Sequence, residues 1–88
     1  METDEKRILI VEDETVIRDA VSAYLERENY AVRGVGDGQS AVEEFQKHSF
    51  DLVILDLMLP KLSGERVCRA IRDVSNVPII MLTAKGEV

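Results

Sequence analysis

The sequence has few of the features that define secreted, membrane-spanning or multidomain proteins. It contains a single cysteine among 88 residues, so an internal disulfide is impossible and a reducing compartment fits better than an oxidising one. The first seven residues lack the cationic start and apolar stretch that export requires, and the longest apolar runs are about as long as a strand. We therefore expect a cytoplasmic protein with no membrane segment.

The sequence also lacks a basic surplus and any obvious linker. Its 17 acidic and 11 basic residues give a formal net charge of -6, which repels nucleic acids and anionic lipid surfaces. No Pro-rich or Gly/Ser-rich stretch and no sequence repeat divides the chain. We expect one domain over residues 1–88 that does not itself bind DNA.

Short apolar runs without polar alternation are typical of strands that are buried on both faces of a parallel sheet. One of the four candidate runs is more polar than the others, as expected of an edge strand. The predicted strands are Ile8–Val11, the more polar Ala31–Val35, Leu52–Leu55 and Val77–Leu82.

Apolar residues at spacings of three and four predict a helix in each connection between strands. The first helix, with a stripe from Val16 to Leu25, should start near Glu14 or Thr15 and cover one face of the sheet. The second follows Asp37-Gly38 and the third follows Ser63, a candidate N-cap; their apolar residues are Ala41, Val42 and Phe45, and Val67, Ala70 and Ile71.

The alternation of strands and helices predicts an α/β fold with a doubly wound parallel sheet in the order 2-1-3-4. In this order the crossovers reverse direction between the first and third strands. The crevice outside the carboxyl ends of these two strands is then the expected binding site.

Acidic residues follow both of these strands. Glu12-Asp13-Glu14 comes after the first strand and Asp56 after the third, so several carboxylates should meet at one sheet edge. Carboxylate oxygens without nearby histidine or cysteine favour Mg²⁺. Asp13 and Glu14 could instead cap the first helix, and Asp56 could start the turn before Pro60. The convergence of the acids, with the Thr83 hydroxyl on the same rim, nevertheless favours a functional site.

Three segments together resemble a response-regulator receiver domain: Ile8–Glu14, Asp51–Pro60 followed by Gly64, and Pro78–Ala84. The Glu-Asp pair and the sequence Leu-Met-Leu-Pro after Asp56 are similar to the subfamily with winged-helix DNA-binding output domains. The resemblance implies a flavodoxin-like sheet, truncated before the fifth strand so that the last β-α unit is missing, and a transcriptional output outside this chain.

The resemblance also implies a role for individual residues. Asp56 would accept a phosphoryl group from a sensor histidine kinase, and Mg²⁺ would be held by Glu12, Asp13, Asp56 and the main-chain carbonyl of Met58. Thr83 would hydrogen-bond the phosphoryl group as the switch, and the small Ala84 would leave room for phosphoryl access.

The sequence leaves two other functions open. One is a non-signalling scaffold or association fragment, which would self-associate through the apolar strand Val77–Leu82. The other is a Mg²⁺-dependent phosphotransferase that acts through an aspartyl phosphate. That class would be expected to carry a second acid just after its nucleophile, where this chain has Leu57-Met58.

Two further features favour ordinary structural roles. His48, after the second predicted helix, is interpreted as a helix-end residue. The glycines at positions 34, 36 and 38 follow the edge strand, whereas the glycine motif of a dinucleotide site follows the first strand. They are therefore interpreted as turn residues.

Overall fold

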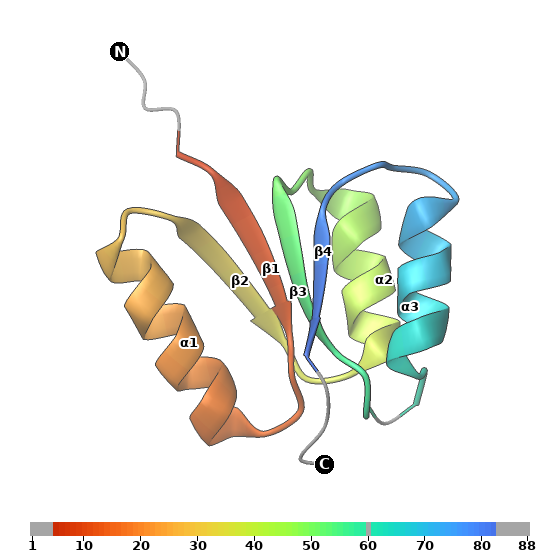
Figure 1. The fold of residues 1–88 in the computed structure, drawn as a ribbon, viewed down its shortest axis with the longest axis horizontal. Helices are drawn as coiled ribbons and strands as arrows, with labels where there is room; N and C mark the ends of the chain where they lie inside the picture. The colour runs from red at the N-terminus through yellow and green to blue at the C-terminus, as the bar shows by residue number, and fades with distance from the viewer. Residues whose placement is uncertain (1–4, 60, 83–88) are drawn as a thin grey trace.

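The computed structural model describes residues 5–59 and 61–82, which form a four-stranded sheet and three helices. Strand and helix alternate along the chain (Figure 1). The elements are β1 (Arg7–Val11), α1 (Thr15–Arg27), β2 (Ala31–Val35), α2 (Gly38–Lys47), β3 (Leu52–Asp56), α3 (Gly64–Arg72) and β4 (Ile79–Leu82).

All strand pairs are parallel, and the strand order is β2-β1-β3-β4, which confirms the predicted doubly wound α/β fold. Strand β1 lies between β2 and β3. In the register, Val11 is opposite Val35 on one side and Leu55 on the other, so the carboxyl ends of these three strands lie together. The edge position predicted for β2 is also confirmed.

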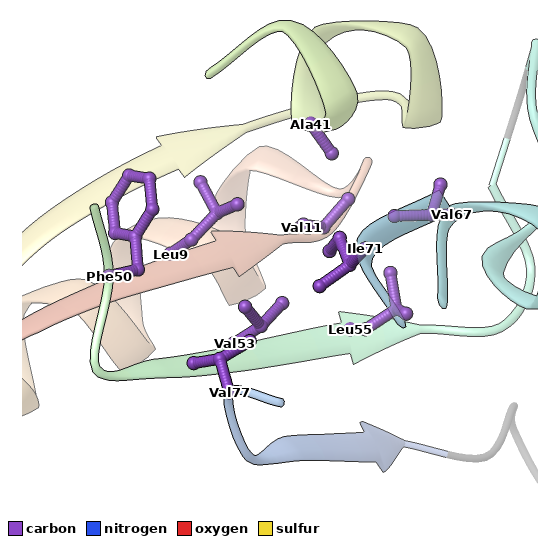
Figure 2. Close-up of a cluster of buried hydrophobic side chains, with 9 residues drawn as sticks. All are labelled: Leu9, Val11, Ala41, Phe50, Val53, Leu55, Val67, Ile71 and Val77. Carbon is purple, nitrogen blue, oxygen red and sulfur yellow. The ribbon is translucent and has the colours of Figure 1, made fainter. Parts of the chain in front are cut away.

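The main core lies between the sheet and the helices α2 and α3, which lie side by side on one face (Figures 1 and 2). Because side chains alternate between the two faces of a strand, every second residue of β1 and β3 enters this core. Small and branched side chains from both helices fill the space above them. The buried cluster consists of Leu9, Val11, Ala41, Phe50, Val53, Leu55, Val67, Ile71 and Val77.

The other face of the sheet is covered by α1 only in part. Ile8 and Ile10 point to this face and are buried. Along the predicted apolar stripe, however, Val21 and Leu25 are half-buried, while Val16 is 80% exposed. Helix α1 therefore covers part of this face, over β2 and β1, as predicted, but the first apolar residue of its stripe is exposed.

Strand β4 is shorter than predicted. It begins at Ile79 and not at Val77, although Val77 is part of the core. The Val77 amide donates to Ser75 Oγ (3.0 Å) and the Val77 carbonyl accepts from Arg72 Nη1 (2.6 Å), so both main-chain groups bond to side chains instead of to a neighbouring strand. Pro78 follows and has no amide hydrogen for a ladder.

The helix starts are largely as predicted. Asp37 caps α2 by accepting from the Ser40 amide (2.7 Å), and Ser63 caps α3 by accepting from the Arg66 amide (3.3 Å). Helix α1 begins at Thr15, and Glu14 occupies the N-cap position without a side-chain cap. His48 is the C-cap of α2, as interpreted from the sequence.

The Asp37 cap makes the stability of the fold depend on pH. The hydrogen bond from the Ser40 main chain lowers the pKa of Asp37, so the folded state favours the carboxylate. A lowered pKa stabilises the fold above the ordinary pKa of aspartate, and this contribution is lost as the pH falls through the lowered value. In urea unfolding near pH 7, Asp37→Ala should lower the free energy of unfolding by about 1 kcal/mol.

The difference in the free energy of unfolding between the wild type and Asp37→Ala should become smaller as the pH is lowered below the ordinary pKa of aspartate. Asp37→Asn is the matched control, because it keeps an oxygen acceptor for the Ser40 amide and removes the titrating group. It should retain most of the stability at neutral pH. An equal loss in Asp37→Asn and Asp37→Ala would contradict the cap assignment.

Gly64 lies against the main chain that follows β3. A Cβ atom at Gly64 would lie 2.5 Å from the carbonyl oxygen of Asp56 and 2.7 Å from Cα of Leu57. Backbone atoms cannot move aside as a flexible side chain can. Gly64→Ala should therefore lower the free energy of unfolding by about 1–3 kcal/mol, despite the higher helix propensity of alanine.

Equilibrium urea unfolding with Arg66→Ala as the comparison checks this prediction, since Arg66 is an exposed residue in the same turn of α3. Gly64→Ala at wild-type stability would mean that α3 and the end of β3 are less closely packed than described.

Candidate functional site

The candidate site lies at the carboxyl edge of the sheet, where the chain leaves β1 and β3. Glu12 and Asp13 follow β1 directly, and Asp56 is the last residue of β3. One carboxylate oxygen from each of these three residues lies within 4.8 Å of the other two. The convergence predicted from the sequence is therefore present in the structure.

Two of the three carboxylates are buried. Glu12 and Asp56 are each 6% exposed, whereas Asp13 is exposed. Burial raises the pKa of Glu12, and the negative charges of Asp56 and Asp13 raise it further, although the Glu14 amide works in the opposite direction. The site thus concentrates negative charge where water solvates it poorly, which favours a cation.

Main-chain amides fix the orientation of the two buried carboxylates. Glu12 Oε2 accepts from the Glu14 amide (3.0 Å), and Asp56 Oδ1 accepts from the Met58 amide (3.1 Å). Both bonds join residues that are two positions apart, the spacing typical of a local side-chain turn. Asp56 therefore also has the turn role considered from the sequence, in addition to its part in the convergence.

The main chain around Asp56 is itself anchored. The Leu57 amide donates to the Leu82 carbonyl at the end of β4 (3.3 Å), and the Gly64 amide donates to the Leu57 carbonyl (3.2 Å). Both β4 and the start of α3 are thus linked to the residue after Asp56. Met58 is exposed beside this turn.

Not every predicted site residue can be placed. Glu12, Asp13 and Asp56 are together, and Met58 lies two residues from Asp56. Thr83 and Ala84 lie outside the described residues. Glu14, which was predicted as part of the acidic group, caps α1 by position and is not among the clustered carboxylates.

The sequence reasoning missed one basic residue next to this site. Arg18, in the first turns of α1, donates from Nη1 to the main-chain carbonyl of Glu12 (2.8 Å). Its place between Ile17 and Asp19 gave no periodic signal. No local pattern linked it to Gly34 in β2 or to Gly36 just after β2, against which its side chain lies.

No helix among residues 5–59 and 61–82 has both the length and the apolar character needed to cross a membrane.

Comparison with known proteins identifies the family. The family model for the response regulator receiver domain matches residues 8–88. The transcriptional regulatory protein ResD of Bacillus subtilis is 49% identical over 86 residues, which cover 98% of this chain and 36% of ResD. The chain thus spans about a third of the length of this relative.

Solved structures have the same fold. The response regulator protein TrrA of Thermotoga maritima, in complex with Mg²⁺-BeF, aligns with a TM-score of 0.85 and 39% identity over 92% of this chain and 71% of TrrA. The receiver domain of a sensor histidine kinase from Pseudomonas aeruginosa, with a magnesium ion in its active-site cleft, gives a TM-score of 0.86 and 38% identity over 92% of this chain and 69% of that domain. Together these matches show that the chain belongs to the receiver domain family of the response regulators of two-component systems.

Proposed function

We propose that this receiver domain is a phosphorylation switch in which Asp56 accepts a phosphoryl group in a Mg²⁺-dependent reaction. The observation that carries the proposal is the convergence of Glu12, Asp13 and Asp56, whose carboxylate oxygens lie within 4.8 Å of one another. The donor would be a phosphohistidine of a sensor histidine kinase or a small acyl phosphate.

The donor set fits Mg²⁺. Its side-chain ligands are hard carboxylate oxygens, two of them from buried residues, and the charges of Asp56 and Asp13 contribute to the raised pKa of Glu12. Glu12, Asp13, Asp56 and the main-chain carbonyl of Met58 would hold the ion. When bound, Mg²⁺ would neutralise the charge that develops between the carboxylate and the phosphoryl group.

The protein's own contribution is orientation. Because the Met58 amide holds Asp56 Oδ1, the carboxylate is oriented before a donor arrives. An Asp56 oxygen would form a bond to phosphorus while the bond from phosphorus to the donor's nitrogen or oxygen breaks, and the bonding electron pair leaves with that donor atom. The product is an acyl phosphate on Asp56 and the dephosphorylated donor.

The signal would leave the site through β4. We assign Thr83 as the residue that hydrogen-bonds the phosphoryl group and Ala84 as the small neighbour that leaves room for it. The link from the Leu57 amide to the Leu82 carbonyl supports this assignment, since it joins the main chain next to Asp56 to the residue that precedes Thr83.

A switch is favoured over a turnover phosphotransferase. The residues that follow Asp56 are Leu57 and the exposed Met58, so no acid stands where a hydrolytic enzyme would carry its second carboxylate. The relatives are signalling proteins, and ResD is a transcriptional regulatory protein. We therefore propose a cytoplasmic regulator whose DNA-binding output, of the winged-helix type, lies outside this chain.

Intact mass after incubation with acetyl phosphate tests the proposed reaction. The chain should gain one phosphoryl group in the presence of Mg²⁺ and none in its absence. Asp56→Asn should abolish the adduct, because the amide is not a competent nucleophile. Glu12→Gln and Asp13→Asn should each reduce the rate by about tenfold or more, because each removes a proposed ligand.

Asp19→Asn is the matched control, since Asp19 is an exposed carboxylate of α1 outside the cluster. It should react like the wild type. A folded wild-type chain that gains no phosphoryl group would favour the non-signalling scaffold instead.

We also propose that the chain self-associates through the segment Val77–Leu82. Strand β4 is at the edge of the sheet, and Ile80 is 49% exposed on it. An exposed apolar edge strand offers unpaired main-chain groups to another chain. Light scattering coupled to size exclusion should show a mass that rises with concentration, and Ile80→Lys should reduce this rise. A strict monomer at every concentration would contradict the proposal.

A further inference from the structure

The side chain of Arg18 crosses the end of β2 at two glycines. A Cβ atom at Gly34 would lie 3.2 Å from both Cγ and Cδ of Arg18, and a Cβ atom at Gly36 would lie 2.9 Å from Nη1. A Cβ at Gly36 would force the guanidinium to move, and one at Gly34 would crowd the side-chain stem. Neither glycine has a positive φ, so the lack of a side chain at these two positions supplies space for Arg18.

The guanidinium is aimed at the loop that carries the acidic pair. Arg18 Nη1 donates to the main-chain carbonyl of Glu12 at 2.8 Å, in a partly buried position. On the other side of the same residue, the Glu12 amide donates to the Val35 carbonyl at 3.0 Å. Both main-chain polar groups of Glu12 are therefore fixed, one by β2 and one by α1.

The bond from Arg18 to Glu12 is one of three hydrogen bonds that join Glu12, Glu14 and Arg18. The Arg18 amide donates to the Glu14 carbonyl (2.9 Å), and the Glu14 amide donates to Glu12 Oε2 (3.0 Å). The loop between β1 and α1 is thus held at its start, through Glu12, and at its end, through Glu14. Loss of the guanidinium would release the carbonyl of Glu12 and loosen the main chain that carries the Glu12 carboxylate.

We propose that Arg18 is a positioning residue for the Mg²⁺ site, and that Gly34 and Gly36 form the track that lets its side chain reach Glu12. The inference rests on the proposed function, because it assigns the effect of Arg18 to the metal-binding loop. Arg18 acts through the main chain of Glu12 and does not itself bind the ion.

Whether Mg²⁺ binding becomes weaker or stronger without Arg18 distinguishes a positioning role from a purely electrostatic effect of its charge. Arg18 is a cation near a cation site, so by Coulomb's law alone its removal would strengthen the binding of Mg²⁺. Loss of positioning has the opposite effect, because the ligands lose their preorganised geometry. Weaker binding in a folded Arg18 variant therefore cannot be a consequence of the lost charge.

Titration calorimetry with MgCl₂ tests the proposal. Arg18→Met, which keeps most of the side-chain volume and removes the donor, should weaken Mg²⁺ binding by about 10- to 100-fold. Arg18→Lys should recover part of the loss, because its ammonium retains a donor on a long side chain. Arg33→Met is the matched control: it removes an arginine from β2 that pairs with Glu44 at 2.9 Å, and it should bind Mg²⁺ like the wild type.

A double-mutant cycle tests whether the glycines act by leaving space for the side chain of Arg18. Gly36→Ala should weaken Mg²⁺ binding in the wild-type background, because the methyl group displaces the guanidinium. In the Arg18→Met background the same substitution should change the affinity much less. Equal effects in both backgrounds, or unchanged affinity in Arg18→Met, would overturn the proposal.

Amide hydrogen exchange measured without metal keeps the two proposals distinguishable. If the folded wild type binds no Mg²⁺, the proposed function fails, but the positioning of the loop is still measurable. Exchange of the Glu14 amide should be faster in Arg18→Met than in the wild type and in Arg33→Met. An unchanged exchange rate would overturn the positioning role whether or not the chain binds metal.

Discussion

Glu12 and Asp56 come from different strands, and their carboxylates are buried within reach of each other and of Asp13. Buried like charges oppose folding: burial, and then the charges of Asp56 and Asp13, raise the pKa of Glu12. The remaining structure must therefore hold the carboxylates together against their repulsion. It does so with the parallel register of β1 and β3, the amides of Glu14 and Met58, and the core beneath them.

The sequence was sufficient to predict much of this arrangement. Unbroken apolar runs indicated β1 and β3, and the topology of alternating strands and helices then required their carboxyl ends to meet. The convergence of Glu12 and Asp56 follows from this topology. The caps at Asp37 and Ser63 were also predictable, because N-cap preferences depend on local chemistry.

Other features depended on tertiary contacts that no local pattern contains. The stripe of α1 predicted a helix that covers one face of the sheet, but periodicity does not show which apolar residues of a helix are buried, and Val16 is exposed. Likewise, the start of β4 was misplaced because Val77 is apolar and buried, yet Ser75 and Arg72 take both of its main-chain groups. The path of Arg18 over Gly34 was equally invisible, since the two residues are far apart in the sequence.

The contact between Arg18 and the two glycines also limits how this sequence can change over time. A larger residue at position 34 or 36 requires the side chain of Arg18 to shift from its place at the end of β2. Conversely, once position 18 has lost its long side chain, this contact no longer favours glycine at positions 34 and 36. Positions 18, 34 and 36 should therefore covary among related sequences, which makes a contact between a helix and a strand detectable from an alignment alone.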